Sequence, residues 1–242
     1  IAGRQGALTI VTVIFNVAVF AIGFWKAGDT SNVLEMCSRL VILFAVITLV
    51  GLNGIHKKTW AALFTTLIVL VMIMGIFDVV IHHAEDLDYS TMEYLGSIEN
   101  PDEIFHAEIL ISGLGAIMDV AVAIAASLSE IVEKKPKVTF LELFKSGREI
   151  GYDIMGTMIN VLLFVFSCGL IPMCLIRMNN DVSLITIIKL HIPCELCRFL
   201  VESIGIVLAI PISILVTSVM IKVPGMFHRQ KKARKVQGEG KC

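Results

Sequence analysis

Two aspartates, Asp119 and Asp153, lie inside long apolar stretches of this sequence. A carboxylate near the centre of a bilayer costs at least about 2.5–3.5 kcal/mol on insertion scales, and residues that bear this cost are typical of ion and proton pathways. Asp119 is near the middle of an uncharged stretch, whereas Asp153 is about one helical turn into the following one. We therefore predict a proton or cation coupling site at these carboxylates, with no catalytic residue, no metal and no cofactor.

The depths of the two carboxylates in the membrane are predicted to match. Asp119 lies about 13 Å from the cytoplasmic end of its stretch, at a rise of about 1.5 Å per residue. If the two helices are adjacent and antiparallel, the carboxylates lie within one or two turns of each other. One of them then holds a proton where water is excluded. The alternative is that Asp119 is neutral and hydrogen-bonded, and simply holds the bundle together.

The surrounding residues supply hydrogen-bonding groups and small side chains. Arg148, Thr157 and Asn160 are the polar residues expected to support the site. Small residues at helical spacing let two membrane helices approach closely. Four glycines are predicted to serve this packing: Gly115, Gly147, Gly151 and Gly156.

The chain as a whole is too apolar for a soluble domain. Of its 242 residues, 56% are hydrophobic and 17% are charged, and the mean hydropathy is +0.84. Soluble domains are nearer to roughly 45–50% apolar and 25% charged. Because a helix needs about 20 apolar residues to cross a bilayer, we predict an all-α polytopic membrane bundle. The expected spans are residues 7–25, 34–52, 59–81, 107–128, 150–176 and 203–221.

The basic residues predict the orientation of these spans, because cytoplasmic loops carry an excess of Lys and Arg. With the N-terminus inside, the cytoplasmic segments receive most of the Lys and Arg residues. The external loop over residues 82–106 contains acidic residues but no Lys or Arg. The prediction is a cell-membrane protein with both ends of the chain in the cytoplasm.

Three segments are expected to lie outside the spans. Residues 129–149 mix charged and apolar side chains and are predicted to lie along the cytoplasmic interface. Residues 183–190 are apolar but too short to span, and Pro193 follows them, so we predict an interfacial or re-entrant helix on the outer side. Residues 228–242 are predicted to form a basic cytoplasmic tail without fixed structure.

The other candidate sites are interpreted as structural. Cys194 and Cys197 form a C-x-x-C without a second pair, which favours small apolar filler over a metal or redox site. His82, His83 and His106 accompany the acidic loop without any metal-binding spacing.

Several ionisable residues are expected near the outer boundary of the membrane. Glu202 is predicted to pair with Arg198, one turn earlier, while Asp78 and Glu108 are predicted to contact water. The sequence contains no phosphate-binding loop, nucleophile motif or dinucleotide fingerprint. We therefore predict a protein that is not an enzyme and does not bind nucleic acid.

The sequence resembles the YibE/F-like family of bacterial multi-pass membrane proteins over nearly its whole length. The resemblance is carried by residues 3–6, 53–58, 115–119, 146–160 and 203–211. Membership would imply a multi-pass membrane protein and names no activity. It implies the lipid bilayer and a second YibE/F-like subunit, or further copies of the chain, as partners. Larger members are expected to carry an extracellular domain ahead of the first of these helices.

Two functions remain open at this point. The first is a transport or export component that uses Asp119, together with Asp153, for coupling. A small-residue helix with a central Asp followed by a helix that opens with Gly, Thr and Asn is similar in pattern to the proton-relay region of resistance-nodulation-division exporters. The second is a non-catalytic scaffold or partner subunit that assembles with another membrane protein. An intramembrane aspartyl hydrolase lacks the required sequence contexts.

Overall fold

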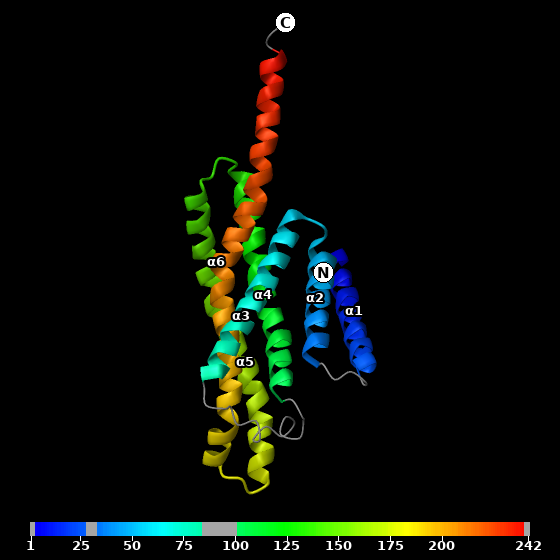
Figure 1. The fold of residues 1–242 in the computed structure, drawn as a ribbon, viewed down its shortest axis with the longest axis vertical. Helices are drawn as coiled ribbons and strands as arrows, with labels where there is room; N and C mark the ends of the chain where they lie inside the picture. The colour runs from blue at the N-terminus through cyan, green and yellow to red at the C-terminus, as the bar shows by residue number, and fades with distance from the viewer. Residues whose placement is uncertain (1–2, 28–32, 84–100, 240–242) are drawn as a thin grey trace.

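The computed structural model describes residues 3–27, 33–83 and 101–239, and these residues form six helices (Figure 1). The helices are α1 (Gly3–Ala27), α2 (Val33–Asn53), α3 (Lys57–His83), α4 (Pro101–Lys134), α5 (Phe140–Asn179) and α6 (Leu184–Glu239). Each is long and apolar enough to cross a membrane. The predicted all-α polytopic bundle is therefore confirmed, and successive helices run antiparallel.

Local sequence signals set the helix ends at one end of the bundle. Gly54 has a φ of +70°, a left-handed conformation that suits glycine, and its N–H bonds the carbonyl oxygen of Val50 at 2.9 Å to close α2. Thr139 and Glu142 form a capping box at the start of α5, each side chain accepting the backbone N–H of the other. We call the end that holds residues 54–56 and 135–139 the basic end, because several lysines cluster there, and the opposite end the distal end.

The packed core lies among α3, α4 and α6. Ile73 of α3, Ile117 of α4 and Ile206 of α6 are completely buried. In Figure 1, α1 and α2 form a hairpin on one side of the other four helices, with α2 nearer to α4. Most of the α5 surface is exposed, as expected for a helix that faces lipid, and its buried residues are Leu143, Gly147 and Gly151.

Two connections differ from their predictions. Residues 129–149 are partly helical, as expected, but their helical parts are continuous with the spans on either side, because α4 continues to Lys134 and α5 already begins at Phe140. Residues 183–190 do not form a separate re-entrant helix either, since α6 runs from Leu184 through Pro193 without a break. A proline removes only one helical hydrogen bond, and neighbouring membrane helices tolerate that loss. The chain likewise stays helical to Glu239, in contrast to the predicted tail without fixed structure.

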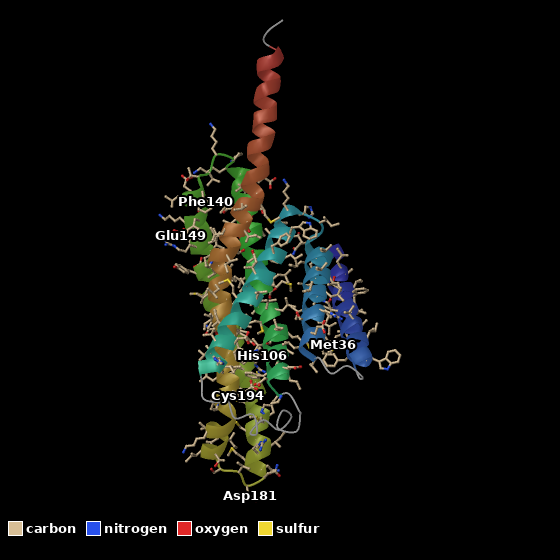
Figure 2. The ribbon with its side chains drawn as sticks, in the orientation of Figure 1. Met36, His106, Phe140, Glu149, Asp181 and Cys194 are labelled. Atoms are coloured by element: carbon tan, nitrogen blue, oxygen red, sulfur yellow. The ribbon has the colours of Figure 1, made fainter. Side chains whose placement is uncertain are left out.

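The α5–α6 hairpin is longer than a bilayer is thick. The 40 residues of α5 span about 60 Å, compared with about 30 Å for the hydrocarbon core. Figure 1 shows this hairpin extending past α3 and α4 at the distal end, and Figure 2 places Asp181 at its tip. Asp181 has a φ of 63° and lies in the turn between the two helices. The first turns of α6 belong to this extension.

Candidate functional site: a charged cluster between α4 and α6

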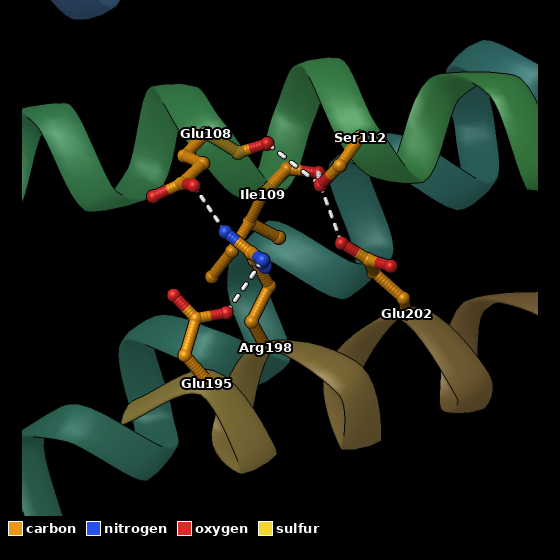
Figure 3. A network of polar contacts seen from close by, with 6 residues as sticks. All are labelled: Glu108, Ile109, Ser112, Glu195, Arg198 and Glu202. Carbon is orange, nitrogen blue, oxygen red and sulfur yellow. Dashed lines mark hydrogen bonds and ion pairs between the residues drawn. The ribbon is translucent and has the colours of Figure 1, made fainter. Parts of the chain in front are cut away.

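A cluster of polar side chains joins α4 to α6 in the distal half of the bundle (Figure 3). We call it the Glu202 cluster, and it consists of Glu108 and Ser112 on α4 and of Glu195, Arg198 and Glu202 on α6. Residues three or four apart lie on one face of a helix. The sequence spacing therefore places each set on one side of its helix, and the parallel packing of α4 and α6 brings the two sides together.

Arg198 is the positive centre of the cluster. Its guanidinium Nη2 lies 2.5 Å from Oε2 of Glu195 on the same helix, and Nη1 pairs with Oε1 of Glu108 on α4. The Arg198 side chain is mostly buried, so these pairs are less screened than surface pairs. The guanidinium thus joins the two helices near the distal end of the membrane-spanning region.

Glu202 is the innermost carboxyl group of the cluster. Its side chain accepts a hydrogen bond from Ser112 Oγ, and the residue is only 6% exposed. Ser112 Oγ also lies 2.7 Å from the backbone carbonyl oxygen of Glu108, one turn earlier. The predicted Glu202–Arg198 pair is therefore replaced by two linked contacts: Arg198 with Glu108 and Glu195, and Glu202 with Ser112.

The cluster has more acidic than basic groups. Three carboxyl groups surround one guanidinium, and a buried charge without a counter-charge is costly. Within the described residues, no group of three His, Cys, Asp or Glu side chains is arranged to hold a metal ion. A carboxyl group in such surroundings can take up and release a proton.

A tight apolar layer lies directly beneath Glu202. A Cβ built on Gly205 of α6 would come within 3.0 Å of Ile117 Cδ1 and 3.2 Å of Ile73 Cγ2. A Cβ on Gly113 of α4 would come within 3.4 Å of Ile73 Cδ1 and 4.0 Å of Glu202 Cγ. We call this contact of α3, α4 and α6 the isoleucine layer, and it separates Glu202 from the basic half of the bundle.

The basic half contains an open pocket at its surface. The pocket has a volume of about 570 Å³ and combines basic, acidic and hydroxyl groups. Its lining residues are His56, Lys57, Lys58, Ala126, Ser127, Ser129, Glu130, Glu133 and Ile221. A smaller cavity of about 10 Å³ adjoins it through Lys58 and Ala126 and also contacts Asn53, Thr59 and Val122. This space is sufficient for about one water molecule.

Buried hydroxyl groups continue inward from these cavities. Thr59, Thr65, Thr217 and Ser218 are nearly or completely buried, and in the described part of the structure their hydroxyl oxygens have no hydrogen-bond partner. Ser213 donates a bond of 3.3 Å to the carbonyl oxygen of Ala121. Polar groups therefore lie on both sides of the isoleucine layer.

Asp119 and Asp153 are not brought together. Both residues are exposed, and neither has a hydrogen-bond or ion-pair partner among the residues that the structure describes. The α4–α5 contact lies at Leu128 and Gly147. Leu128 is nine positions from Asp119, so the two side chains point in about opposite directions from α4.

The predicted packing glycines divide into two groups. Gly147 and Gly151 lie against α6, next to Ile214 and Ile210 respectively. Gly115 and Gly156, by contrast, have open space where a Cβ would lie, with no atom within 4 Å.

The predicted polar residues form contacts within α5. The Arg148 guanidinium lies 6.0 Å from the Tyr152 ring centroid. Thr157 Oγ1 donates to the carbonyl oxygen of Ile154 at 2.7 Å, and Asn160 Nδ2 donates to that of Gly156 at 2.7 Å.

Sequence reasoning pairs Glu202 with Arg198 and leaves Glu108 in contact with water, and it assigns no role to Ser112 or Glu195. The signal that identifies the Glu202 cluster is the spacing of Glu195, Arg198 and Glu202 on one helical face, together with Glu108 and Ser112 on another. Asp78 is exposed, in agreement with the predicted contact with water, and its Oδ1 also lies 2.8 Å from His106 Nε2. Cys194 is buried in the core and Cys197 packs against it, in agreement with a filler role.

Comparison with known proteins identifies the family. The family model described as YibE/F-like protein matches residues 1–223. No curated protein and no solved structure matches the chain. Since the family model covers most of the sequence, the chain belongs to the YibE/F-like family of multi-pass membrane proteins.

Proposed function

We propose that this protein is a transport or export component of the bacterial cell membrane in which Glu202 takes up and releases a proton. The observation that carries the proposal is the position of Glu202, a 6% exposed carboxyl group inside a membrane-spanning helix. Intramembrane ionisable residues commonly mark ion or proton pathways. In this proposal the protein is not an enzyme, and both ends of the chain are cytoplasmic.

The hydrogen bonds of Ser112 depend on whether Glu202 carries a proton. A serine hydroxyl has one proton to donate, and Ser112 Oγ is close to two acceptors, the Glu202 carboxylate and the carbonyl oxygen of Glu108. When Glu202 is ionised, Ser112 donates to it. When Glu202 is protonated, it donates to Ser112 Oγ, and Ser112 turns to the Glu108 carbonyl. Proton uptake thereby reverses the direction of the hydrogen bond between α4 and α6 and commits the Ser112 proton to a bond within α4.

The charge of the cluster changes with the same proton. Arg198 is already shared by Glu108 and Glu195. A proton on Glu202 therefore removes a negative charge that has no basic partner of its own, and its release restores that charge. Because such a charge is costly in a medium of low dielectric, the two states favour different packing of α4 against α6.

Access to Glu202 is proposed to alternate between the two sides of the membrane. The positive-inside rule places the basic end in the cytoplasm, so the Glu202 cluster faces the outside and the 570 Å³ pocket faces the cytoplasm. The isoleucine layer then closes the path between them. Transporters commonly open such a seal on one side at a time by moving one group of helices against another.

The test is proton flux into vesicles that contain the purified protein and a pH-sensitive dye. We expect flux under an imposed pH gradient, and loss of that flux in Glu202→Gln, which keeps the shape of the side chain but cannot ionise. Glu149→Gln, at an exposed position of α5 outside both the Glu202 cluster and the pocket, is the matched control and should retain flux. Equal flux in the wild type and Glu202→Gln would contradict the proposal. An infrared carbonyl band of a protonated carboxyl group that Glu202→Gln removes would support it independently.

A non-transporting scaffold is the second candidate function. It is favoured by the outward positions of Asp119 and Asp153, which suit contact with another membrane protein. Asp119→Asn separates the two candidates. Loss of flux in this variant would support the coupling role predicted from sequence, whereas loss of a co-purifying partner with no flux in the wild type would support the scaffold.

A further inference from the structure

We propose that copies of this chain associate head to tail in the membrane. The face of α4 that carries Gly115 and Asp119 in one copy packs on the face of α5 that carries Gly156 and Asn160 in the next. We call these the α4 face and the α5 face. The proposal does not rest on the proposed transport function, because neither face includes a member of the Glu202 cluster.

The first argument is the exposure of Asp119. It lies in the middle of α4, on the surface of the bundle, with no hydrogen-bond or ion-pair partner in the described residues. A carboxyl group facing hydrocarbon at this depth is costly, and intramembrane acidic residues usually face protein or water. The α4 face is therefore expected to be covered by protein when the chain is in a membrane.

The second argument is a match in depth. Leu128 of α4 contacts the position of Gly147 on α5, which fixes the register of these antiparallel helices. Asp119 is nine residues beyond Leu128, and Gly156 is nine residues beyond Gly147, so both lie about 13 Å further into the membrane. Copies with the same topology share the same depth. Asp119 of one copy therefore lies level with Gly156 of any neighbouring copy, and Asn160 is one turn away.

The third argument is direction. Nine residues correspond to about two and a half helical turns, so Asp119 points away from the α4–α5 contact on α4 and Gly156 points away from it on α5. The two faces are thus on different sides of the chain. Such faces cannot meet around a two-fold axis, but they suit a head-to-tail interface, which closes into a ring or continues as a chain.

The fourth argument is chemical complementarity. Gly115 and Gly156 each have open space where a side chain would begin, so two helices can approach closely there. Asn160 uses one N–H for the carbonyl oxygen of Gly156, and its amide group has a second N–H. That second donor is the partner that the Asp119 carboxyl group requires. A two-fold contact of α4 faces would instead place two Asp119 carboxyl groups together.

Cysteine cross-linking in membranes tests the proposal. Gly115→Cys and Gly156→Cys are suitable variants because neither glycine has an atom within 4 Å of the new Cβ. The native cysteines are first replaced by serine or alanine. We expect oxidation of membranes that co-express the two single variants to give a cross-linked dimer. The double variant should give a dimer and higher multiples, as a head-to-tail contact requires.

Matched controls come from glycines with equal free space. Gly75→Cys and Gly169→Cys also meet no atom within 4 Å, and this pair should not cross-link. Efficient cross-linking of Gly115→Cys with itself would overturn the proposal in favour of a two-fold dimer. Equal cross-linking in the control pair, or none in the test pair, would also overturn it. The native mass of the wild type in lipid nanodiscs is an independent readout, and a monomer there would overturn the proposal even if the variants fail to fold.

Discussion

Leu128 of α4 packs over Gly147 of α5, and a Cβ on the glycine would come within 3.2 Å of Leu128 Cδ2. The same glycine lies against Ile214 of α6, so one residue without a side chain lets three helices meet near the basic end. This contact sets both the depth and the rotation of α4 relative to α5. It is therefore also the reason that Asp119 and Asp153 face away from each other.

The close packing of α5 on α6 predicts a steric effect at Gly151. A Cβ there would overlap Ile210 Cγ2, so Gly151→Ala is expected to lower the free energy of unfolding by about 1–3 kcal/mol through overpacking. Thermal unfolding in detergent measures the change.

Gly169→Ala is the matched control on the same helix. The site has no neighbour within 4 Å, and alanine favours a helix over glycine by about 1 kcal/mol. We expect this variant to be as stable as the wild type or more stable. Equal losses at Gly151 and Gly169 would show that α5 does not pack on α6 as described.

Removal of the Arg198 guanidinium is predicted to destabilise the bundle. Arg198→Met leaves Glu108 and Glu195 without their counter-charge, and breaking a fully buried pair costs about 3–5 kcal/mol. Because the Arg198 side chain is 22% exposed, we expect about 2–3 kcal/mol in the same unfolding assay. Combining Arg198→Met with Glu108→Gln and Glu195→Gln should recover most of the loss.

The exposed pair of Arg39 and Glu35 provides the comparison for Arg198. Their side chains are 77% and 59% exposed, and such pairs contribute about 0–1 kcal/mol. Arg39→Met should therefore have little effect. A similar small effect for Arg198→Met would mean that the Glu202 cluster is solvated rather than buried between α4 and α6.

The number and type of the helices can be predicted from the sequence, because the length of an apolar run decides whether it can span a bilayer. Their ends are harder to predict. Pro193 separates the segment from Ser183 to Leu190 from the last predicted span, because proline usually stops a helix in water. In the structure α6 runs through that proline, since packed membrane helices tolerate the loss of one hydrogen bond.

The candidate site can be predicted only in part, because depth can be counted along a sequence but rotation cannot. The similar depths of Asp119 and Asp153 follow from residue counts. Their opposite directions depend on which faces of α4 and α5 meet, and the Leu128–Gly147 contact decides that. The same limit hides the meeting of Glu202 with Ser112, since the two residues are 90 positions apart in the chain.

Replacing either of two adjacent buried threonines on α3 by valine is predicted to change the stability of the protein in opposite directions. Thr65 and Thr66 are both completely buried. The Thr65 hydroxyl has no partner in the described structure, whereas Thr66 Oγ1 donates to the carbonyl oxygen of Ala62 at 2.9 Å. Valine has nearly the same shape as threonine, so Thr65→Val should stabilise the protein by about 1 kcal/mol, while Thr66→Val should cost about 1 kcal/mol. The opposite order in thermal unfolding would mean that Thr65 is hydrated.

Truncation of the isoleucine layer is predicted to lower the stability of the protein and to let protons leak through it. Ile73 and Ile117 are completely buried beneath Glu202, and truncation of such a residue to alanine costs about 2–5 kcal/mol. Because this layer separates the Glu202 cluster from the pocket at the basic end, Ile73→Ala should also raise proton flux in vesicles without any change at Glu202. Phe77→Ala is the matched control: Phe77 is completely buried on the same helix and packs on Phe105 at 5.4 Å between ring centroids. It should lose similar stability without a comparable leak. A leak of equal size in both variants would locate the seal elsewhere in the bundle.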